Sequence, residues 1–438
     1  MNSTNSRPSG VYAVTLGCPK NRVDTEFILG DLLSNGFELF DSPDEADVVI
    51  VNTCGFLASA RQESIDTLVA MASSMKRGAR LVAAGCMAEK FEAEIRARVP
   101  SVDIVCGVRS LLDIRRMLQG GNRGPCVLPD SSNPRLVTTG AVAYLKVADG
   151  CNRRCAYCLI PSIKGRQKSR PVQDLVNEAR GLASTGVREI VVVAQDLSRY
   201  GRDLDDKTDL VALVRGLSGV DGIDWVRLMY LFPSDIPDEL LDAIAESRNC
   251  LPYLDIPVQH ADDSVLAAMR RNTTRRGLEK LFGRLRDRIP GLVLRTTLMT
   301  GFPGETDAAF ANLRDFVEQV RFDMVGVFEF SPEPGSAAAR LPGQVFPDVA
   351  SARRVELESV LSGIAATRRL EMIGTVVQAV AESVDEDSGR VIGRSWFQAP
   401  EVDGVTVIDG LSGDDDAVCQ VMITGCEDSD FLATRYDG

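Results

Sequence analysis

The chain has 438 residues, 45% of them hydrophobic, which is enough for several cores and, at the usual domain size, for about three domains. Its first residues lack the apolar core of a signal peptide, and no apolar run approaches the roughly 20 residues that span a membrane, so we expect a cytoplasmic protein with reduced thiols. The 11 cysteines are an odd number and exclude a small disulfide framework, and the net charge is −13.

Residues 1–10 are polar and predict a disordered N-terminus, whereas residues 11–125 alternate apolar runs with helical patterns. Three strands and three helices are expected, the strands at 11–16, 48–51 and 81–84 and the helices at 22–33, 59–75 and 88–98. This alternation is typical of a parallel α/β sheet, which is the fold that we expect for an N-terminal domain.

A cysteine follows each of these predicted strands, at Cys18, Cys54 and Cys86. Because the carboxyl ends of parallel strands meet at one edge of a sheet, where ligands bind, we expect the three thiols to lie close together as metal ligands. Buried cysteines are also common in strands as small hydrophobic side chains, but three at successive strand ends favour a shared site. Cys106 ends a further short apolar run and, from its position alone, could be a fourth ligand.

A loop with three more cysteines follows a predicted strand at 143–147. Cys151, Cys155 and Cys158 are separated by three and then two residues, so the short loop can bring them to one iron–sulfur cluster at little entropic cost. A cluster of four irons held by three cysteines keeps one iron open for a small molecule. The alternative is a zinc site, but zinc prefers four closed ligands and no fourth ligand is nearby in the sequence.

Strand–helix alternation continues through residues 137–369, which predict a central domain built as an open (β/α)6 partial barrel. Its strands are expected at 143–148, 189–194, 225–230, 253–256, 292–297 and 324–328. The active site of such a fold lies at the carboxyl ends of the strands. Gln195 and Asp196, which follow one strand, and Arg295, which lies within another, are therefore candidate cofactor contacts. The only histidine, His260, is interpreted as an ordinary hydrogen-bonding residue of a loop.

Residues 341–350 are rich in Pro and Gly and predict a connection, which a helix at 353–370 follows. In residues 371–438, turn residues separate short alternating stretches, which predict the strands of a small antiparallel β-barrel at 375–380, 390–393, 405–408 and 419–423. This segment carries 15 acidic and 3 basic residues, a net charge of −12. A domain that grips transfer RNA should be basic, because phosphate contacts dominate that affinity, so we expect a basic protein partner. The alternative is a solvated acidic face that only aids solubility.

The spacing of the loop cysteines resembles that of the radical S-adenosylmethionine (SAM) enzymes. With the three separated N-terminal cysteines and a C-terminal barrel of the TRAM type, nearly the whole chain resembles the methylthiotransferases, a branch of that superfamily. Three motifs resemble the members that modify a ribosomal protein rather than transfer RNA, namely LGCPKN at 16–21, IPSIKG at 160–165 and DIPVQH at 255–260. One departure is Thr25, where a serine is more usual, although the hydroxyl is kept.

This resemblance implies two four-iron clusters and SAM as cofactors. The loop cysteines would hold the cluster whose open iron binds SAM, and the three N-terminal cysteines would hold the second cluster, which leaves Cys106 structural. Tyr157, just before the last loop cysteine, would lie close to the adenine of SAM. No side chain is implied as catalytic beyond those that hold the cofactors.

The implied activity converts C–H to C–S–CH3 at the β-carbon of an aspartate in the twelfth protein of the small ribosomal subunit. An unactivated carbon has no acidic proton, so the cofactor must provide a radical. An electron donor of the flavodoxin or ferredoxin type would be a partner, whereas transfer RNA and a membrane would not. The alternatives are methylthiolation of adenosine in transfer RNA and a non-catalytic iron–sulfur sensor that binds RNA.

Overall fold

The computed structural model describes residues 9–124, 127–138, 140–206, 208–411 and 417–438. The chain divides into two compact units, the first made of residues 1–138, 148–153 and 158–170 and the second of residues 139–147, 154–157 and 171–438. The division expected from the sequence, at 1–10, 11–125, 137–369 and 371–438, stays a prediction.

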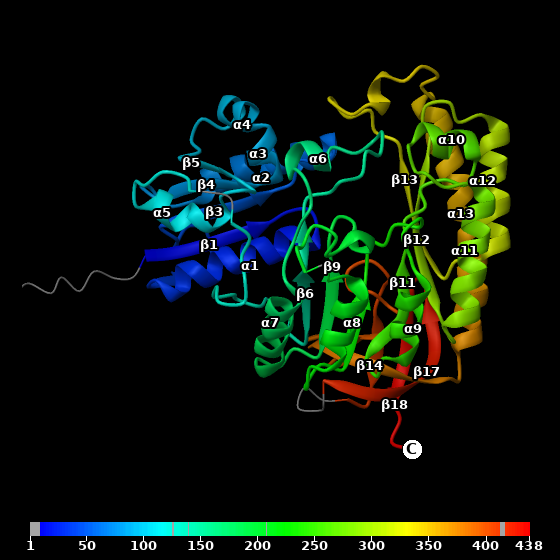
Figure 1. The fold of residues 1–438 in the computed structure, drawn as a ribbon. Coiled ribbons are helices and arrows are strands. Elements are labelled where there is room, and N and C mark those ends of the chain that lie inside the picture. Colours follow the sequence, from blue (N-terminus) through cyan, green and yellow to red (C-terminus); the bar gives the residue numbers. More distant parts are fainter. Residues whose placement is uncertain (1–8, 125–126, 139, 207, 412–416) are drawn as a thin grey trace, which may run out of the picture. The chain divides into compact units, whose positions relative to one another are not determined.

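A five-stranded parallel sheet in the order β2-β1-β3-β4-β5 forms most of the first unit (Figure 1). Its strands are β1 (Ser9–Thr15), β2 (Phe37–Leu39), β3 (Val48–Thr53), β4 (Arg80–Gly85) and β5 (Ile104–Gly107). The helices of this part are α1 (Pro19–Ser34), α2 (Ala58–Ser74), α3 (Cys86–Lys90), α4 (Glu92–Arg98) and α5 (Ile114–Leu118). Strand β3 is buried along its whole length, with Val49 and Val51 in the core on one face and Val48 and Ile50 in the core on the other. The predicted N-terminal α/β sheet is therefore confirmed.

Most of the segment around the loop cysteines also belongs to the first unit. It contains β7 (Ala148–Asp149), α6 (Ile160–Ile163) and β8 (Lys168–Ser169), of which β7 and β8 pair antiparallel. Leu159 and Ile163 pack in a small apolar cluster with Cys86, the residue that follows β4. The segment after Cys158 is thereby attached to the carboxyl edge of the N-terminal sheet.

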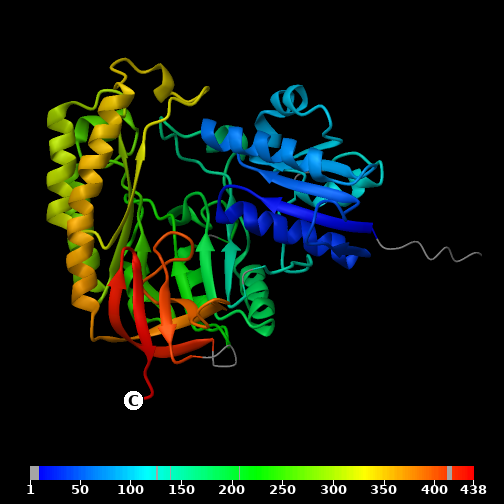
Figure 2. The ribbon, with the colours of Figure 1, turned by 180° about the vertical axis from the view of Figure 1, so that it is seen from behind.

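The second unit is built on a six-stranded parallel sheet in the order β13-β12-β11-β10-β9-β6. Its strands are β6 (Val142–Lys146), β9 (Glu189–Val193), β10 (Trp225–Leu228), β11 (Cys250–Asp255), β12 (Val293–Thr300) and β13 (Met324–Glu329). Its helices are α7 (Val172–Ser184), α8 (Leu210–Ser218), α9 (Asp238–Glu246), α10 (Asp263–Ala268), α11 (Arg275–Arg288), α12 (Asp307–Val320) and α13 (Pro347–Met372). Helices α11, α12 and α13 lie side by side next to β12 and β13 (Figures 1 and 2). Each strand pairs with its successor along the chain, which confirms the predicted open (β/α)6 arrangement.

A closed barrel of five strands follows α13, in the order β14-β15-β16-β18-β17. The strands are β14 (Val376–Val384), β15 (Val391–Ser395), β16 (Thr406–Asp409), β17 (Val418–Glu427) and β18 (Asp430–Arg435). Strands β16 and β18 pair parallel, whereas the other neighbours pair antiparallel. Five strands cannot alternate in direction all the way round a closed barrel, so one parallel pair is unavoidable. The predicted C-terminal barrel is confirmed, with this one exception to its antiparallel pairing.

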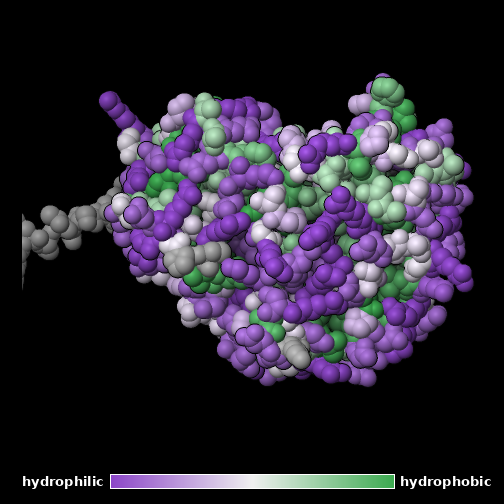
Figure 3. Space-filling model, turned by 45° about the horizontal axis from the view of Figure 1, so that its top comes forward, coloured by the Kyte–Doolittle hydropathy of each residue, from purple (hydrophilic) through white to green (hydrophobic). Residues whose placement is uncertain are grey.

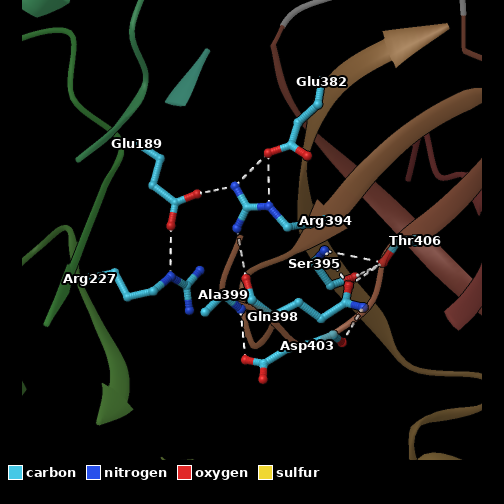
Figure 4. A network of polar contacts seen from close by, with 9 residues as sticks. All are labelled: Glu189, Arg227, Glu382, Arg394, Ser395, Gln398, Ala399, Asp403 and Thr406. Atoms are coloured by element: carbon cyan, nitrogen blue, oxygen red, sulfur yellow. Dashed lines mark hydrogen bonds and ion pairs between the residues drawn. The ribbon is translucent and has the colours of Figure 1, made fainter. Parts of the chain in front are cut away.

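Buried ion pairs join this barrel to the six-stranded sheet (Figure 4). The guanidinium of Arg394, on β15, donates to Glu189 Oε2 at 2.5 Å and contacts Glu382 Oε1 at 2.7 Å. Arg227, on β10, donates to the other oxygen of Glu189 at 2.7 Å. Burial alone would raise the pKa of Glu189, but the two guanidinium groups lower it, so the carboxylate is ionised. The sheet and the barrel therefore share one buried polar interface.

Hydrophilic side chains cover most of the face drawn in Figure 3, and hydrophobic residues are scattered between them. Charged residues make up 25% of the sequence, which fits such a surface. Within the described residues, no helix combines the length and the apolar character that crossing a membrane requires.

Candidate functional site

Three cysteines lie at the carboxyl edge of the N-terminal sheet, as the sequence predicts. Cys18 follows β1, Cys54 follows β3, and Cys86 opens α3 directly after β4. Strands β1 and β3 flank the point where the strand order of the sheet reverses, which is where such sheets bind ligands. A Cβ atom on Gly17 would lie 2.9 Å from the sulfur of Cys54, so the loop after β1 approaches this thiol as closely as only glycine permits.

Asn21 ties these strand ends together, although the sequence did not single it out as a site residue. Its side-chain amide donates to the carbonyl of Leu16 at 2.9 Å and to the carbonyl of Thr53 at 3.3 Å. Its side-chain oxygen accepts from the thiol of Cys86 at 3.7 Å. Asn21 is fully buried, so these contacts are shielded from water. The available signal was its place at the end of the motif at 16–21.

Cys86 is buried and Cys54 is partly buried, so burial and neighbouring charges change the ionisation of these two thiols. The pKa of Cys86 is raised to about 12, mainly by burial and also by the neighbouring Cys18 and Cys54, whereas the charge of Lys164 acts against this rise. Burial also raises the pKa of Cys54. The protein alone therefore keeps the thiol of Cys86 protonated at neutral pH, and a bound metal has to displace that proton.

This donor set fits an iron–sulfur cluster. The three cysteines are free thiols, which are the ligands that such clusters use. In the part of the chain that the structure describes, no three Cys, His, Asp or Glu side chains gather closely enough to hold a single ion. The cysteines of a four-iron cluster can lie farther apart than the ligands of a single ion, because each cysteine binds a different iron.

Cys106 differs from the three edge cysteines in its surroundings. It is fully buried in the hydrophobic core, and its thiol donates to the carbonyl of Ser110 at 3.0 Å. These contacts favour the predicted structural role.

The loop that carries the other three cysteines has residues in both units, and each unit holds its part of the loop by its own contacts. In the first unit, the backbone N–H of Cys151 donates to the carbonyl of Gly165 at 3.1 Å. The N–H of Arg153 points at the sulfur of Cys151, and the N–H of Ile160 points at the sulfur of Cys158, each at 3.4 Å. Backbone donors aimed at cysteine sulfurs are typical of iron–sulfur sites, where they adjust the reduction potential.

In the second unit, Arg271 contacts both Cys155 and Tyr157. Its Nη1 atom lies 3.9 Å from the sulfur of Cys155 and 3.4 Å from the hydroxyl oxygen of Tyr157. The guanidinium also stacks on the ring of Phe232, with 3.9 Å between its carbon and the ring centroid. Arg271 is not predicted from the sequence, because an arginine between helical segments carries no local signal.

The other predicted SAM contacts occupy different positions in the second unit. Gln195 and Asp196 follow β9 at the carboxyl end of the sheet, where a cofactor would bind, and they stay predictions. Arg295 lies near the start of β12 and donates to Asp255 and to Asp403, each at 3.2 Å. Asp403 precedes β16 of the barrel. These contacts favour a structural role for Arg295 over the predicted place in the SAM pocket.

His260 is fully buried beside this sheet, and its Nδ1 atom accepts from the backbone N–H of Asp262 at 3.0 Å. Burial lowers the pKa of His260 to about 4, so the ring is neutral at physiological pH. Both observations fit the interpretation as a hydrogen-bonding residue rather than a proton-transfer group.

Comparison with known families agrees with this architecture. Residues 10–107 match the uncharacterized protein family UPF0004, residues 145–317 match the radical SAM superfamily, and residues 373–435 match the TRAM domain. Together with the two parallel sheets, the closed barrel and the loop of three cysteines, these matches define a radical SAM protein with a C-terminal TRAM domain.

Individual relatives narrow this class. The chain is 42% identical to the ribosomal protein uS12 methylthiotransferase RimO of Anaeromyxobacter sp. (strain K), over 96% of this chain and 92% of that protein. It is 39% identical to RimO of Syntrophus aciditrophicus (strain SB), over 98% of each chain. The chain therefore belongs to the RimO family of ribosomal protein uS12 methylthiotransferases, which confirms the predicted resemblance.

Two solved structures share the fold at low sequence identity. TsrM from Kitasatospora setae, a radical SAM methyltransferase solved with cobalamin and a 4Fe–4S cluster, has a TM-score of 0.56 and 16% identity, over 74% of this chain and 75% of that one. The cobalamin-dependent SAM radical enzyme OxsB has a TM-score of 0.52 and 13% identity, over 88% of this chain and 64% of that one. At these identities the likeness concerns the fold alone.

Proposed function

We propose that this chain methylthiolates ribosomal protein uS12, the twelfth protein of the small subunit, at the β-carbon of an aspartate. The observation that carries the proposal is the pair of three-cysteine sets in a chain of the RimO family, each set one ligand short of closing a four-iron cluster. Cys151, Cys155 and Cys158 hold one cluster, with SAM on its open iron. The edge cysteines after β1, β3 and β4 hold the second.

The bound clusters and SAM supply the radical, the sulfur and the methyl group by which C–H becomes C–S–CH3. The chain's own residues hold and orient these groups. Arg271 braces Cys155 and Tyr157 from one side, so that the cofactor meets a fixed surface. Ala156, between them, packs with Met269 and Phe302 in an apolar cluster, which excludes water from the neighbourhood of a reactive radical.

Two protein partners follow from this activity. An electron donor of the flavodoxin or ferredoxin type has to reduce the loop cluster, because the cleavage of SAM to a radical consumes an electron. The substrate is a basic ribosomal protein, and the net charge of −12 on residues 371–438 supports its attraction to the barrel. Transfer RNA would be repelled by the same charge.

Mass spectrometry of cells that lack this gene tests the proposal. We expect unmodified uS12 and unchanged transfer RNA, and we expect the modification to return with the wild-type chain. The chain with Cys18→Ala, Cys54→Ala and Cys86→Ala should fail to restore it, whereas Cys106→Ala, outside both sets, should restore it. Loss of a methylthio group from transfer RNA would overturn the substrate, and normal modification of both molecules would favour a sensor without catalysis.

Iron content tests the cofactor assignment directly. Replacing the three loop cysteines by alanine should remove about half of the iron and sulfide of anaerobically reconstituted protein and abolish SAM cleavage. Replacing the three edge cysteines should remove about half of the iron but leave SAM cleavage intact. If either triple variant keeps its full iron content, the assignment of two clusters is wrong.

A further inference from the structure

Lys164 is a deeply buried lysine with two carboxylate partners inside the first unit. Only 2% of its side chain is exposed, and its Nζ atom lies 3.0 Å from Asp149 Oδ1 and 3.6 Å from Asp24 Oδ2. Asp149 belongs to β7, just before the loop cysteines, and Asp24 belongs to α1, just after Cys18. Burying a charge is costly unless it is paired, so an ion triplet of this kind needs either a structural or a functional reason.

The surroundings of Lys164 place it beside the edge cysteines. Ile163, the residue before it, packs against Cys86. Asp24 lies one helical turn beyond Asn21, whose side chain bonds Cys86. The charge of Lys164 agrees with this placement, because it acts to lower the pKa of both Cys86 and Cys54.

We propose that Lys164 is a fixed cation that raises the reduction potential of the cluster held by the edge cysteines, and that Asp24 and Asp149 keep it in position. A cluster held by thiolates becomes more negative when it takes up an electron. A nearby positive charge therefore stabilises the reduced state more than the oxidised state, and the low dielectric of a buried site strengthens the effect. Lys164 is thus a positioning residue that acts through the field at the cluster. This inference rests on the proposed function, because that function places a cluster at this site.

The test is a redox titration of the full chain in which the three loop cysteines are replaced by alanine, so that only the second cluster assembles. Lys164→Met removes the cation at similar size, and we expect reduction to become at least tenfold less favourable, which is about 59 mV for a one-electron couple. Asp24→Asn removes one negative charge at nearly constant shape, so the potential should rise. Lys164→Arg keeps the charge and should stay near the wild-type potential.

A matched control separates the local effect from net charge. Lys76→Met changes the net charge of the chain equally, but Lys76 pairs with Asp47 before β3, at the opposite edge of the sheet, and 37% of its side chain is exposed. Lys76→Met should leave the potential unchanged, because solvent screens the charge of Lys76 over the distance to the cluster.

The double variant Asp24→Asn with Lys164→Met restores the local net charge and should return the potential toward that of the wild type. If Lys164→Met alone loses the cluster, this double variant still tests the role of the charge of Lys164. Shifts of Lys164→Met and Asp24→Asn in the same direction, or no shift in either, would overturn the role of Lys164. If no cluster assembles with Lys164 in place, the proposed second cluster fails instead, so the two failures are distinguishable.

Discussion

Asn21 illustrates how a single buried amide can define the geometry of a site made from separate strands. Asn21→Ala would leave the buried carbonyl of Thr53 and the part-buried carbonyl of Leu16 without this donor. An unsatisfied buried group costs about 1–3 kcal/mol, and a part-buried group costs somewhat less. We therefore expect the free energy of unfolding to fall by about 2–5 kcal/mol. Urea unfolding of the cluster-free chain measures this change, and reconstituted protein should hold less iron at the edge cysteines.

Asn35→Ala is the matched control for this experiment. Asn35 lies at the other end of α1 and is exposed, and its amide bonds only to Asp31 in the same helix. Its replacement should change stability by at most about 0.5 kcal/mol and leave the iron content unchanged. An equal loss of iron in both variants would show that α1 as a whole, rather than the amide of Asn21, holds the site.

The burial of His260 predicts a pH dependence of stability. Its pKa falls from an ordinary value of 6.5 to about 4 on folding, so between these values the unfolded chain binds a proton that the native state does not. The buried, neutral ring of His260 therefore contributes to the free energy of unfolding in full above pH 6.5. This contribution, about 3 kcal/mol in total, is lost as the pH falls toward 4.

His260→Gln removes this titration and provides the comparison. Between pH 7 and pH 4, the wild-type chain should lose about 3 kcal/mol more unfolding free energy than the variant, as measured by urea titrations. The pKa of Glu305 shifts in the opposite direction, because burial raises it to about 7. This titration affects the stability of both proteins equally, so it cancels when their unfolding free energies are subtracted. Parallel pH curves for the two proteins would contradict the buried, neutral state of His260.

At the scale of helices and strands, the sequence predicts the long periodic elements well and the short ones poorly. The helix expected at 353–370 is found within α13, but α13 already begins at Pro347. The Pro- and Gly-rich stretch was expected to be a connection, yet proline suits the first turn of a helix, where its missing N–H would have no partner. Strands β2 and β18 were not expected, because three residues in one and two alternating buried side chains in the other give too little periodicity.

The barrel interface also belongs to this scale and gives a prediction. Arg394→Met leaves Glu189 buried with one cation fewer, and breaking a buried ion pair from one side costs about 3–5 kcal/mol. We expect urea unfolding to detect a loss of this size. The double variant Glu189→Gln with Arg394→Met should recover none of it, because it leaves the buried guanidinium of Arg227 without its carboxylate.

Arg390→Met serves as the control, since Arg390 precedes the same strand but forms an exposed ion pair with Asp409. Exposed pairs contribute about 0.2–1 kcal/mol, so its loss should be small. A similar cost for both arginines would mean that the Arg394 network adds nothing beyond surface electrostatics.

Across the whole molecule, the sequence predicts six cysteine ligands but gives no sign of the residues that contact or surround them. Cysteine spacing is a local signal, and strand order places the edge cysteines together without further knowledge. Asn21, Lys164 and Arg271 act through partners that are distant in the sequence, such as Asp24 for Lys164 and Cys155 for Arg271. No local pattern encodes such pairs, so only the folded chain reveals them.

The uneven charge of the molecule predicts salt-dependent binding of the substrate. Asp414, Asp415 and Asp416 are part of the acidic segment and lie outside the described residues. Replacing them by lysine should weaken binding of ribosomal protein uS12 and make it less sensitive to salt, mainly through a slower association rate. Binding measured at two salt concentrations, with transfer RNA as the comparison ligand, tests this. Unchanged binding of the protein would leave the three aspartates as a solvated surface, and tight binding of transfer RNA by the unmodified chain would contradict the electrostatic argument.

The buried contacts of the C-terminal barrel affect the interpretation of activity measured on truncated and chimeric forms of this enzyme. A chain cut before residue 371 would lose Arg394 and Asp403, and it would leave Glu189, Tyr253 and Arg295 without their barrel partners at a newly wetted surface. Loss of activity in such a chain would report damage to the six-stranded sheet as much as loss of substrate recognition. An exchanged barrel from a relative should be accepted only if it supplies an arginine and a carboxylate at the positions of Arg394 and Asp403.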